Sequence, residues 1–151
     1  MDYELFVFSI YKVEELTEKL VCMVKNILKR DVNCISRKDE YIFIGCETFG
    51  ITIEIEDISD LDYIKESCRI NINLCISIQV SHKTFDEGIR ELFQIIINLL
   101  KIVDGDILFL FNGEKQVLRR DNGVLTLNED VEYIPYELID IPYKKEKLLN
   151  L

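Results

Sequence analysis

The stretch from Asp106 to Asn128 constrains the fold of this 151-residue chain more than any other stretch. It holds three short runs rich in apolar residues, separated by the pairs Asn112-Gly113 and Asn122-Gly123. Asn and Gly accept positive φ at little cost, and a type I′ hairpin turn needs positive φ at both central residues. The runs are Ile107–Phe111, Gln116–Arg120 and Val124–Leu127. This pattern predicts a three-stranded meander.

The first of these runs, Ile107–Phe111, is apolar at every position. A strand without polar alternation is covered on both faces, so we expect this one near the middle of a sheet. The segment Asp2–Ile10 also places apolar side chains on both faces and is a second candidate for a central strand. The rest of the chain is expected to pack around these two strands.

Two segments have the periodicity of amphipathic helices. Val13–Arg30 is acidic in its first turns and basic in its last, an order that suits the helix dipole. Thr84–Val103 has the broader apolar face and is expected to be the more deeply buried helix. Thr84 and Glu87 have the spacing of a capping box, and Asp104-Gly105 is expected to end the helix.

The remaining segments read as strands, one loop and a packed tail. Strands are expected over Asn33–Ser36, Tyr41–Cys46, Ile51–Glu56 and Arg69–Ser81. The polar segment Asp57–Cys68 predicts a loop with a short helical turn. The tail, Glu129–Leu151, is too apolar to be free, although its two prolines exclude a long helix. We expect it to pack along the sheet and to bury Ile141, Tyr143, Leu148 and Leu149.

The order of these elements predicts a fold of the α+β class. We expect a two-layer sandwich in which a mainly antiparallel sheet carries two helices on one face and ends in the three-stranded meander. Residues 1–151 show no linker, repeat or low-complexity segment, so we expect a single domain. The strand order and the oligomeric state are left open.

The meander also carries a resemblance. Its residues Asn112-Gly113-Glu114, Leu118-Arg119-Arg120, Asn122-Gly123 and Leu125-x-Leu127-Asn128, with Ile141-Pro142-Tyr143 downstream, are similar to the C-terminal signature of a bacterial immunity-protein family. That family is associated with the Sit swarm-inhibition toxins of contact-dependent bacterial competition. The resemblance implies a small cytoplasmic protein that neutralises a cognate toxin and is not an enzyme. A Trp that follows the meander in the family is absent here, and Tyr133 or Tyr136 takes its place.

Composition narrows the class of partner. The net charge of −10 argues against binding to nucleic acid or to an anionic membrane, because both need basic patches. It is compatible with a basic protein partner, and also with acidity that only maintains solubility. No apolar run reaches the roughly 20 residues of a membrane span, and the start of the chain lacks the basic residues of a signal peptide. A cytoplasmic location is therefore expected, with the five cysteines reduced.

No residue pattern indicates catalysis, a metal or a cofactor. Cys75 and His82 differ by an odd number of residues, which places them on opposite faces of the predicted strand. The spacing Asp57-x-x-Asp60-x-Asp62 has the wrong alternation for a calcium loop. Arg119 and Arg120 point to opposite faces and are expected to be structural, one pairing with Glu114 and the other with acidic residues of the tail. We expect no catalytic residues, no metal site and no cofactor.

The function that remains is a binding surface on the polar face of the strands. Thr52, Glu54, Glu56, Ser77, Gln79, Asn71 and Asn73 are expected to share that face. We expect its acidic residues to bind the cognate toxin, a possibly basic protein; they are Glu54, Glu56, Asp57, Asp60 and Asp62. Two alternatives stay open: a small enzyme with an unrecognised active site, and a self-associating structural module. A deep pocket with perturbed carboxylates would favour the enzyme.

Overall fold

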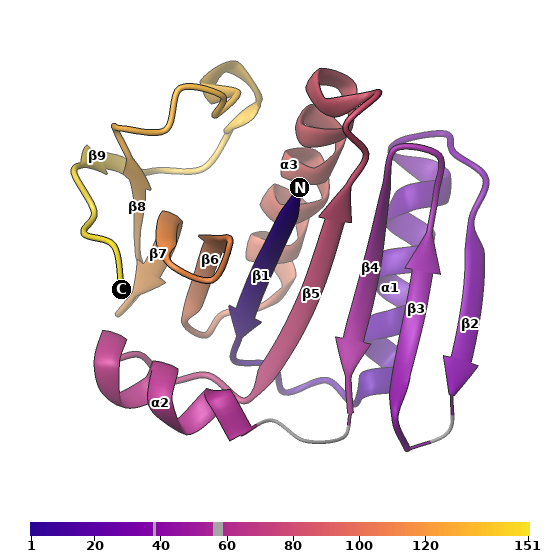
Figure 1. Ribbon diagram of the computed structural model, residues 1–151, viewed down its shortest axis with the longest axis horizontal. Coiled ribbons are helices and arrows are strands. Elements are labelled where there is room, and N and C mark those ends of the chain that lie inside the picture. The colour runs from indigo at the N-terminus through magenta and orange to yellow at the C-terminus, as the bar shows by residue number, and fades with distance from the viewer. Residues whose placement is uncertain (38, 56–58) are drawn as a thin grey trace.

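The protein is described by a computed structural model over residues 1–37, 39–55 and 59–151. The strands of these residues form one sheet in the order β2-β3-β4-β5-β1-β6-β7-β8-β9 (Figure 1). All neighbouring strands are antiparallel except β8 and β9, which are parallel. The strands are β1 (Asp2–Val7), β2 (Asn33–Arg37), β3 (Tyr41–Gly45), β4 (Phe49–Glu54), β5 (Leu74–Val80), β6 (Ile107–Phe111), β7 (Lys115–Asp121), β8 (Val124–Asn128) and β9 (Lys144–Glu146). The α+β class and the mainly antiparallel sheet are confirmed.

The two apolar strands lie in the middle of this sheet, as predicted. The first strand of the chain, β1, is bonded to β5 on one side and to β6 on the other. Val7 of β1 and Leu108, Phe109 and Leu110 of β6 have no exposed surface. Strands that are apolar on both faces are stable only where both faces are covered, and the two layers described next provide that cover.

One face of the sheet is covered by α1 (Val13–Asn26) and α3 (Phe85–Ile102), which lie behind it in Figure 1. Leu16, Leu20 and Val24 of α1 are buried at helical spacing. The longer α3 buries ten residues and is the more deeply buried of the two, as expected. These side chains join the inward residues of the strands in the main hydrophobic core.

A third helix, α2 (Ser59–Cys68), lies on the opposite face, where we expected a loop with only a short helical turn. Its apolar stripe consists of just Leu61, Ile64 and Cys68, which explains why the pattern was missed. These three residues pack with Phe6, Leu108 and Leu110 in a second, smaller core. The helix therefore covers the apolar residues that the central strands direct away from α1 and α3.

The strand predicted over Arg69–Ser81 is shorter than expected: β5 begins only at Leu74, and residues 69–73 form the connection that follows α2. Arg69 follows α2 with a positive φ of 51°, and the Ile70 N–H bonds the carbonyl of Lys65. Ile70 and Ile72 pack in the second core under α2, whereas Leu74 and the rest of the apolar row face α1 and α3. The apolar alternation over Arg69–Ser81 therefore does not correspond to one face of one strand.

The meander has the geometry that its Asn-Gly pairs predicted. Asn112 and Gly113 have φ values of 51° and 74°, and Asn122 and Gly123 have values of 50° and 78°. In the second turn, Asp121 pairs with Val124, which leaves the two residues of a tight hairpin between them. The first turn has three residues between the paired Phe111 and Lys115, and a register shift follows within the hairpin.

The ends of α3 are stabilised differently from our expectation. Thr84 makes no capping hydrogen bond, and Glu87 pairs with Arg30 instead. Gly105 has no positive φ; a Cβ there would lie 2.7 Å from the Cβ of Phe8, so the residue permits a close approach of two chain segments. Neither the capping box nor the helix-ending glycine describes the structure correctly.

The first part of the tail packs on the main core through side chains, including Ile139 and Ile141, and its end is attached mainly through its backbone. Val131 and Ile134 are buried, but Leu149 is 74% exposed and Tyr143 is 37% exposed, so their predicted burial was wrong. The tail adds β9 to the edge of β8, and the Leu151 N–H bonds the carbonyl of Glu114. Hydrogen bonds to strands satisfy polar backbone groups without a buried side chain, and apolar composition alone does not distinguish the two arrangements.

Candidate partner-binding face

Beside α2, the sheet has a face that no helix of the described residues covers. It comprises the outward side chains of β2, β3, β4, β5 and the start of β1, on the side turned away from α1 and α3 (Figure 1). Strand pairing aligns these side chains in rows that cross the strands. The central row is Ile35, Phe43, Thr52, Ser77 and Glu4, and the next row is Asn33, Gly45, Gly50, Gln79 and Asp2. We call this surface the open face.

The open face changes in chemistry from one side to the other. At the β2 and β3 side it is apolar: Ile35 is 45% exposed and lies in register with the half-buried Phe43. In the middle it is polar and uncharged, through Thr52 and Ser77. At the β1 side it is acidic, because Asp2 and Glu4 alternate with the buried Tyr3 and Leu5.

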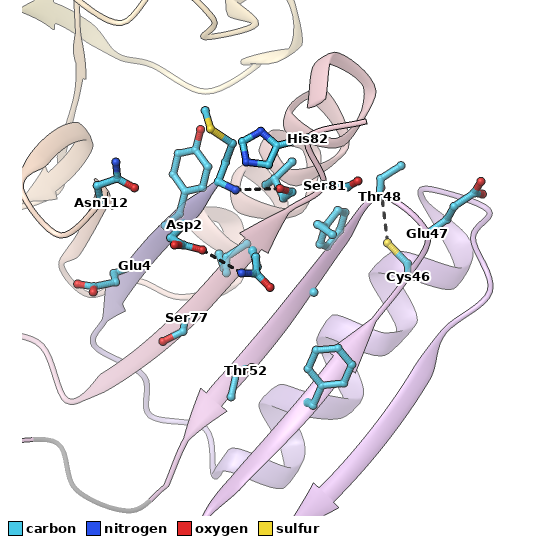
Figure 2. A pocket seen from close by; sticks show the side chains of 18 of the residues that line it. Asp2, Glu4, Cys46, Glu47, Thr48, Thr52, Ser77, Ser81, His82 and Asn112 are labelled. Carbon is cyan, nitrogen blue, oxygen red and sulfur yellow. Dashed lines mark hydrogen bonds between the residues drawn. The ribbon is translucent and has the colours of Figure 1, made fainter. Parts of the chain in front are cut away.

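An open groove with a volume of about 1040 Å³ lies along the upper part of this face. Its lining comes from β1, β3, β4 and β5, and from the turns that follow β3, β5 and β6. Figure 2 shows Asp2 and Glu4 along one wall, Ser77 and Thr52 across the middle, and His82 and Asn112 near one end. The amino group of Met1 donates to the Val80 carbonyl at 3.1 Å and so belongs to this end too.

Carboxylates dominate the charge of the groove. Among the described residues that line it, the acidic side chains are Asp2, Glu4 and Glu47, and there is no Lys or Arg. Asp2 accepts a hydrogen bond from the neutral amide of Gln79 at 3.2 Å, which leaves its negative charge in place. A groove of this kind attracts cations, and its low-dielectric walls strengthen that attraction.

The third carboxylate, Glu47, is part of a cluster that joins the segment after α1, the helix α3 and the turn after β3. Arg30 pairs with Glu47 at 2.8 Å and with Glu91 at 3.0 Å. Glu91 is buried and also accepts a hydrogen bond from Thr48 Oγ1 at 3.1 Å. Hydrogen bonding to Glu91 raises the pKa of Arg30, which keeps the guanidinium charged. The cluster stabilises the fold next to the groove. Because Arg30 pairs with Glu47 whereas Asp2 accepts from a neutral amide, Glu47 contributes less negative charge to the groove than Asp2 does.

Of the acidic residues predicted to bind a partner, Glu54 and Asp62 have described side chains, and these lie on two different elements. Glu54 ends β4 on the open face and accepts a hydrogen bond from Ser77 Oγ at 3.4 Å. Asp62 is exposed on α2. Glu56 and Asp57 lie outside the described residues, and so does the side chain of Asp60. Whether this set binds a partner stays a prediction.

The polar strand face predicted from the sequence is present in part. Thr52, Glu54, Ser77 and Gln79 do share the open face. Asn71 and Asn73 precede β5 and act in a loop: the Asn71 N–H bonds Asp106, and Asn73 bonds the backbone of Ser9 through both side-chain atoms.

Cys75 and His82 lie at opposite ends of β5. Cys75 is the second residue of the strand, and His82 follows its end and is exposed. At a rise of roughly 3.3 Å per residue, seven residues separate the two by about 20 Å. A dyad of these two side chains is therefore not formed in this geometry.

The comparison with protein families identifies the chain. The model of the SitI3-like family matches residues 46–136, which is more than half of the sequence. The chain belongs to the SitI3-like family. This is an immunity-protein family of Sit toxin systems, so the resemblance seen in the meander is confirmed. No curated protein and no solved structure gives a significant match.

The family match covers much of the open face. It begins in the turn after β3 and includes β4, β5 and the whole meander, but not β1, α1 or β2. The groove therefore combines residues from inside the matched region with Asp2, Glu4 and Phe43 from outside it.

Within the described residues, no helix is long and apolar enough to cross a membrane.

Asp2, Glu4 and Phe43 were missed as candidates from the sequence. Asp2 and Glu4 alternate with apolar residues and so carry a strand signal, but their position beside Ser77 depends on the pairing of β1 with β5. That pairing joins Asp2 and Glu4 to residues more than 70 positions away, and no local pattern specifies it.

Proposed function

We propose that this protein is a cytoplasmic immunity protein that binds a cognate toxin and blocks it without chemistry. Membership of the SitI3-like family carries this proposal. The acidic open face supports it, because long-range attraction between opposite charges speeds association with a basic toxin domain. In this proposal the acidic set Glu54, Glu56, Asp57, Asp60 and Asp62 adds to the negative charge that attracts the toxin.

The direct test measures protection and stoichiometry together. The product of each gene that adjoins this one is expressed in a bacterial host with and without this protein, and the activity of a product that kills the host is then titrated with purified protein in vitro. A protein that acts by binding abolishes activity at one equivalent, and the complex survives gel filtration. Protection that needs far less than one equivalent would instead support the enzyme hypothesis, and unchanged killing of the host would remove the immunity assignment.

The contribution of the acidic set is tested through association kinetics. Exposed charges act mainly on the on-rate, which falls as salt shortens the range of the field to about 8 Å at physiological ionic strength. Glu54→Lys combined with Asp62→Lys is expected to lower the on-rate and its salt dependence while the melting temperature stays nearly unchanged. The matched control, Glu14→Lys with Glu18→Lys on the exposed side of α1, changes the same charge elsewhere.

A further inference from the structure

The floor of the groove is apolar at its β3 side. Gly45 and Gly50 pair with each other across β3 and β4, and the Phe43 ring lies against both. A Cβ at Gly45 would be 2.7 Å from Phe43 Cε1, and a Cβ at Gly50 would be 2.8 Å from Phe43 Cε2. The two glycines thus allow the ring to pack down on the backbone, while the ring stays only half-buried and lines the groove.

The acidic wall stands opposite this floor at a defined separation. In the central row, Phe43 lies in β3 and Glu4 in β1, with Thr52 and Ser77 on the two strands between them. Neighbouring strands are roughly 4.8 Å apart, so three steps across the sheet separate the apolar floor from the acidic wall by about 14 Å. An extended peptide covers that distance in about four residues.

The middle of the groove suits the backbone of such a peptide. Thr52, Ser77 and Gln79 present hydroxyl and amide groups that both donate and accept hydrogen bonds. A peptide that crosses the strands at right angles needs such side-chain partners, because the strands of the sheet already use their backbone groups on one another. The apolar and charged ends of the groove then recognise side chains, and the polar middle recognises the main chain.

We propose that the groove binds an extended segment of the toxin in which a Lys or Arg follows or precedes an apolar residue by about four positions. This rests on the proposed function. The apolar side chain packs on Phe43, and the cation binds between Asp2 and Glu4. Charge complementarity selects this occupant: Asp2 and Glu4 form the wall, the described lining has no Lys or Arg, and the Met1 amino group lies at the His82 end, where it donates to the Val80 carbonyl. A second copy of this chain offers a competing occupant through Lys144, Lys145 and Lys147 of its tail.

The first experiment uses charge removal without a change of shape. Asp2→Asn with Glu4→Gln is compared with Glu14→Gln plus Glu18→Gln, which removes the same charge from the exposed side of α1. The groove pair is expected to weaken binding of the toxin encoded by the neighbouring gene roughly tenfold, and the control pair to change it less than about twofold. Thermal melts establish that both variants are folded. Equal binding by the groove pair and the wild type would overturn the proposal.

The second experiment separates failure of the groove from failure of the proposed function. Wild-type protein labelled with ¹⁵N is titrated with the acetylated peptide Leu-Ser-Gly-Ser-Arg, and with the same peptide ending in Glu. Amide shifts at Thr52 and Gln79 with the Arg peptide alone support the groove assignment even if the toxin of the neighbouring gene does not bind. Equal effects of both peptides, or none at these amides at millimolar concentration, overturn it.

A measurement of the oligomeric state tests the competing occupant, a second copy of the chain. Light scattering of wild type and of the Asp2→Asn and Glu4→Gln pair is expected to give the same monomer mass. A wild-type dimer that the groove variant converts to monomer would assign the groove to a second copy of the chain and would overturn the toxin-segment proposal. The Thr52→Arg variant gives an independent check, since a cation placed in the middle of the groove should repel the toxin segment as well as fill its space.

Discussion

Arg119 and Arg120 are neighbours in β7, yet each binds the carbonyl end of a different helix on a different face of the sheet. Arg120 donates to the carbonyls of Leu100 at 2.7 Å and Gly105 at 2.8 Å, and also to Val103, at the end of α3. Arg119 donates to the carbonyl of Cys68, the last residue of α2, at 2.8 Å. We predicted a structural role for both arginines, but the predicted partners, Glu114 and acidic residues of the tail, were wrong. One dipeptide instead fastens both helical layers to the meander.

The two arginines should differ in their contribution to stability. Arg120 is buried, and Arg120→Met would leave several buried carbonyls without a donor, so it is expected to lower the free energy of unfolding by about 3 kcal/mol. Arg119→Met is the matched control and is expected to cost about 1 kcal/mol, because its side chain is 19% exposed and bonds a single carbonyl. Urea denaturation measures both. Equal losses would contradict the anchoring role of Arg120.

The packing of Phe43 on two glycines predicts a coupling between them. Gly50→Ala is expected to displace the ring and to cost about 1 kcal/mol through overpacking. In a Phe43→Ala background, the same change is expected to be neutral or stabilising by about 0.5 kcal/mol, because alanine restricts the unfolded chain. A double-mutant cycle in urea gives the coupling, and additive effects would mean that the ring does not rest on Gly50.

Asn128 should hold the tail to the meander. It is 1% exposed; its amide donates to the Gln116 carbonyl at 2.6 Å, and its oxygen accepts from the Asp130 and Leu148 N–H groups. Asn128→Ala is expected to cost about 2 kcal/mol and to speed hydrogen exchange at Leu148. The exposed Asn150→Ala is the control and should change neither quantity. Unchanged exchange at Leu148 would show that the tail is held elsewhere.

The position of Ile96 in the main core predicts that a charged side chain there prevents folding. Ile96 is 1% exposed in the centre of α3, so Ile96→Asp would bury an unpaired charge and is expected to unfold the protein. Asn98→Asp, two residues further along the same helix and only partly buried, is expected to leave a folded protein. Far-ultraviolet circular dichroism and a thermal melt distinguish the two outcomes, and a cooperative wild-type melt for Ile96→Asp would exclude Ile96 from the core.

A pH titration tests the attachment of the tail to α3. The hydrogen bond from Lys101 to Asp140, 2.8 Å long, lowers the pKa of Asp140 below its ordinary value. A depressed folded-state pKa stabilises the fold above the ordinary Asp pKa, and this contribution is lost as the pH falls through the lower value. The side-chain ¹³C signal of Asp140 should therefore titrate below the ordinary Asp range, and in Lys101→Met it should return to that range. An unchanged midpoint in Lys101→Met would show that Lys101 does not lower the pKa of Asp140.

The parts of the fold that sequence predicted well are those specified by neighbouring residues. Positive φ at Asn122 and Gly123 follows from residue type, and the apolar run of β6 requires cover on both faces, so the meander and the central strand were both predicted. The helix α2 was missed because three apolar residues form too short a stripe to stand out. The start of β5 was wrong because polar and apolar residues continue to alternate through a turn at Arg69.

The groove was less predictable than the fold, because it is assembled from distant segments. Glu54 and Ser77 could be assigned to one polar face, since each lies in an alternating strand. Asp2 and Phe43 could not be placed beside them, because the order β3-β4-β5-β1 brings together strands from both ends of the first 80 residues. Side-chain alternation shows which residues share a face of one strand, but not which strands are neighbours.

The central place of β1 has a consequence for the time at which the protein becomes active in a cell. β1 is made before every other strand, but its partners are β5, which ends at Val80, and β6, which ends at Phe111. At about 5–20 residues per second, a ribosome needs roughly 5–20 s to advance from β1 to the end of β6. Until then the middle of the sheet cannot close, and Asp2 and Glu4 have no groove to line. Under the function proposed above, only a chain completed through β6 presents this groove to a toxin.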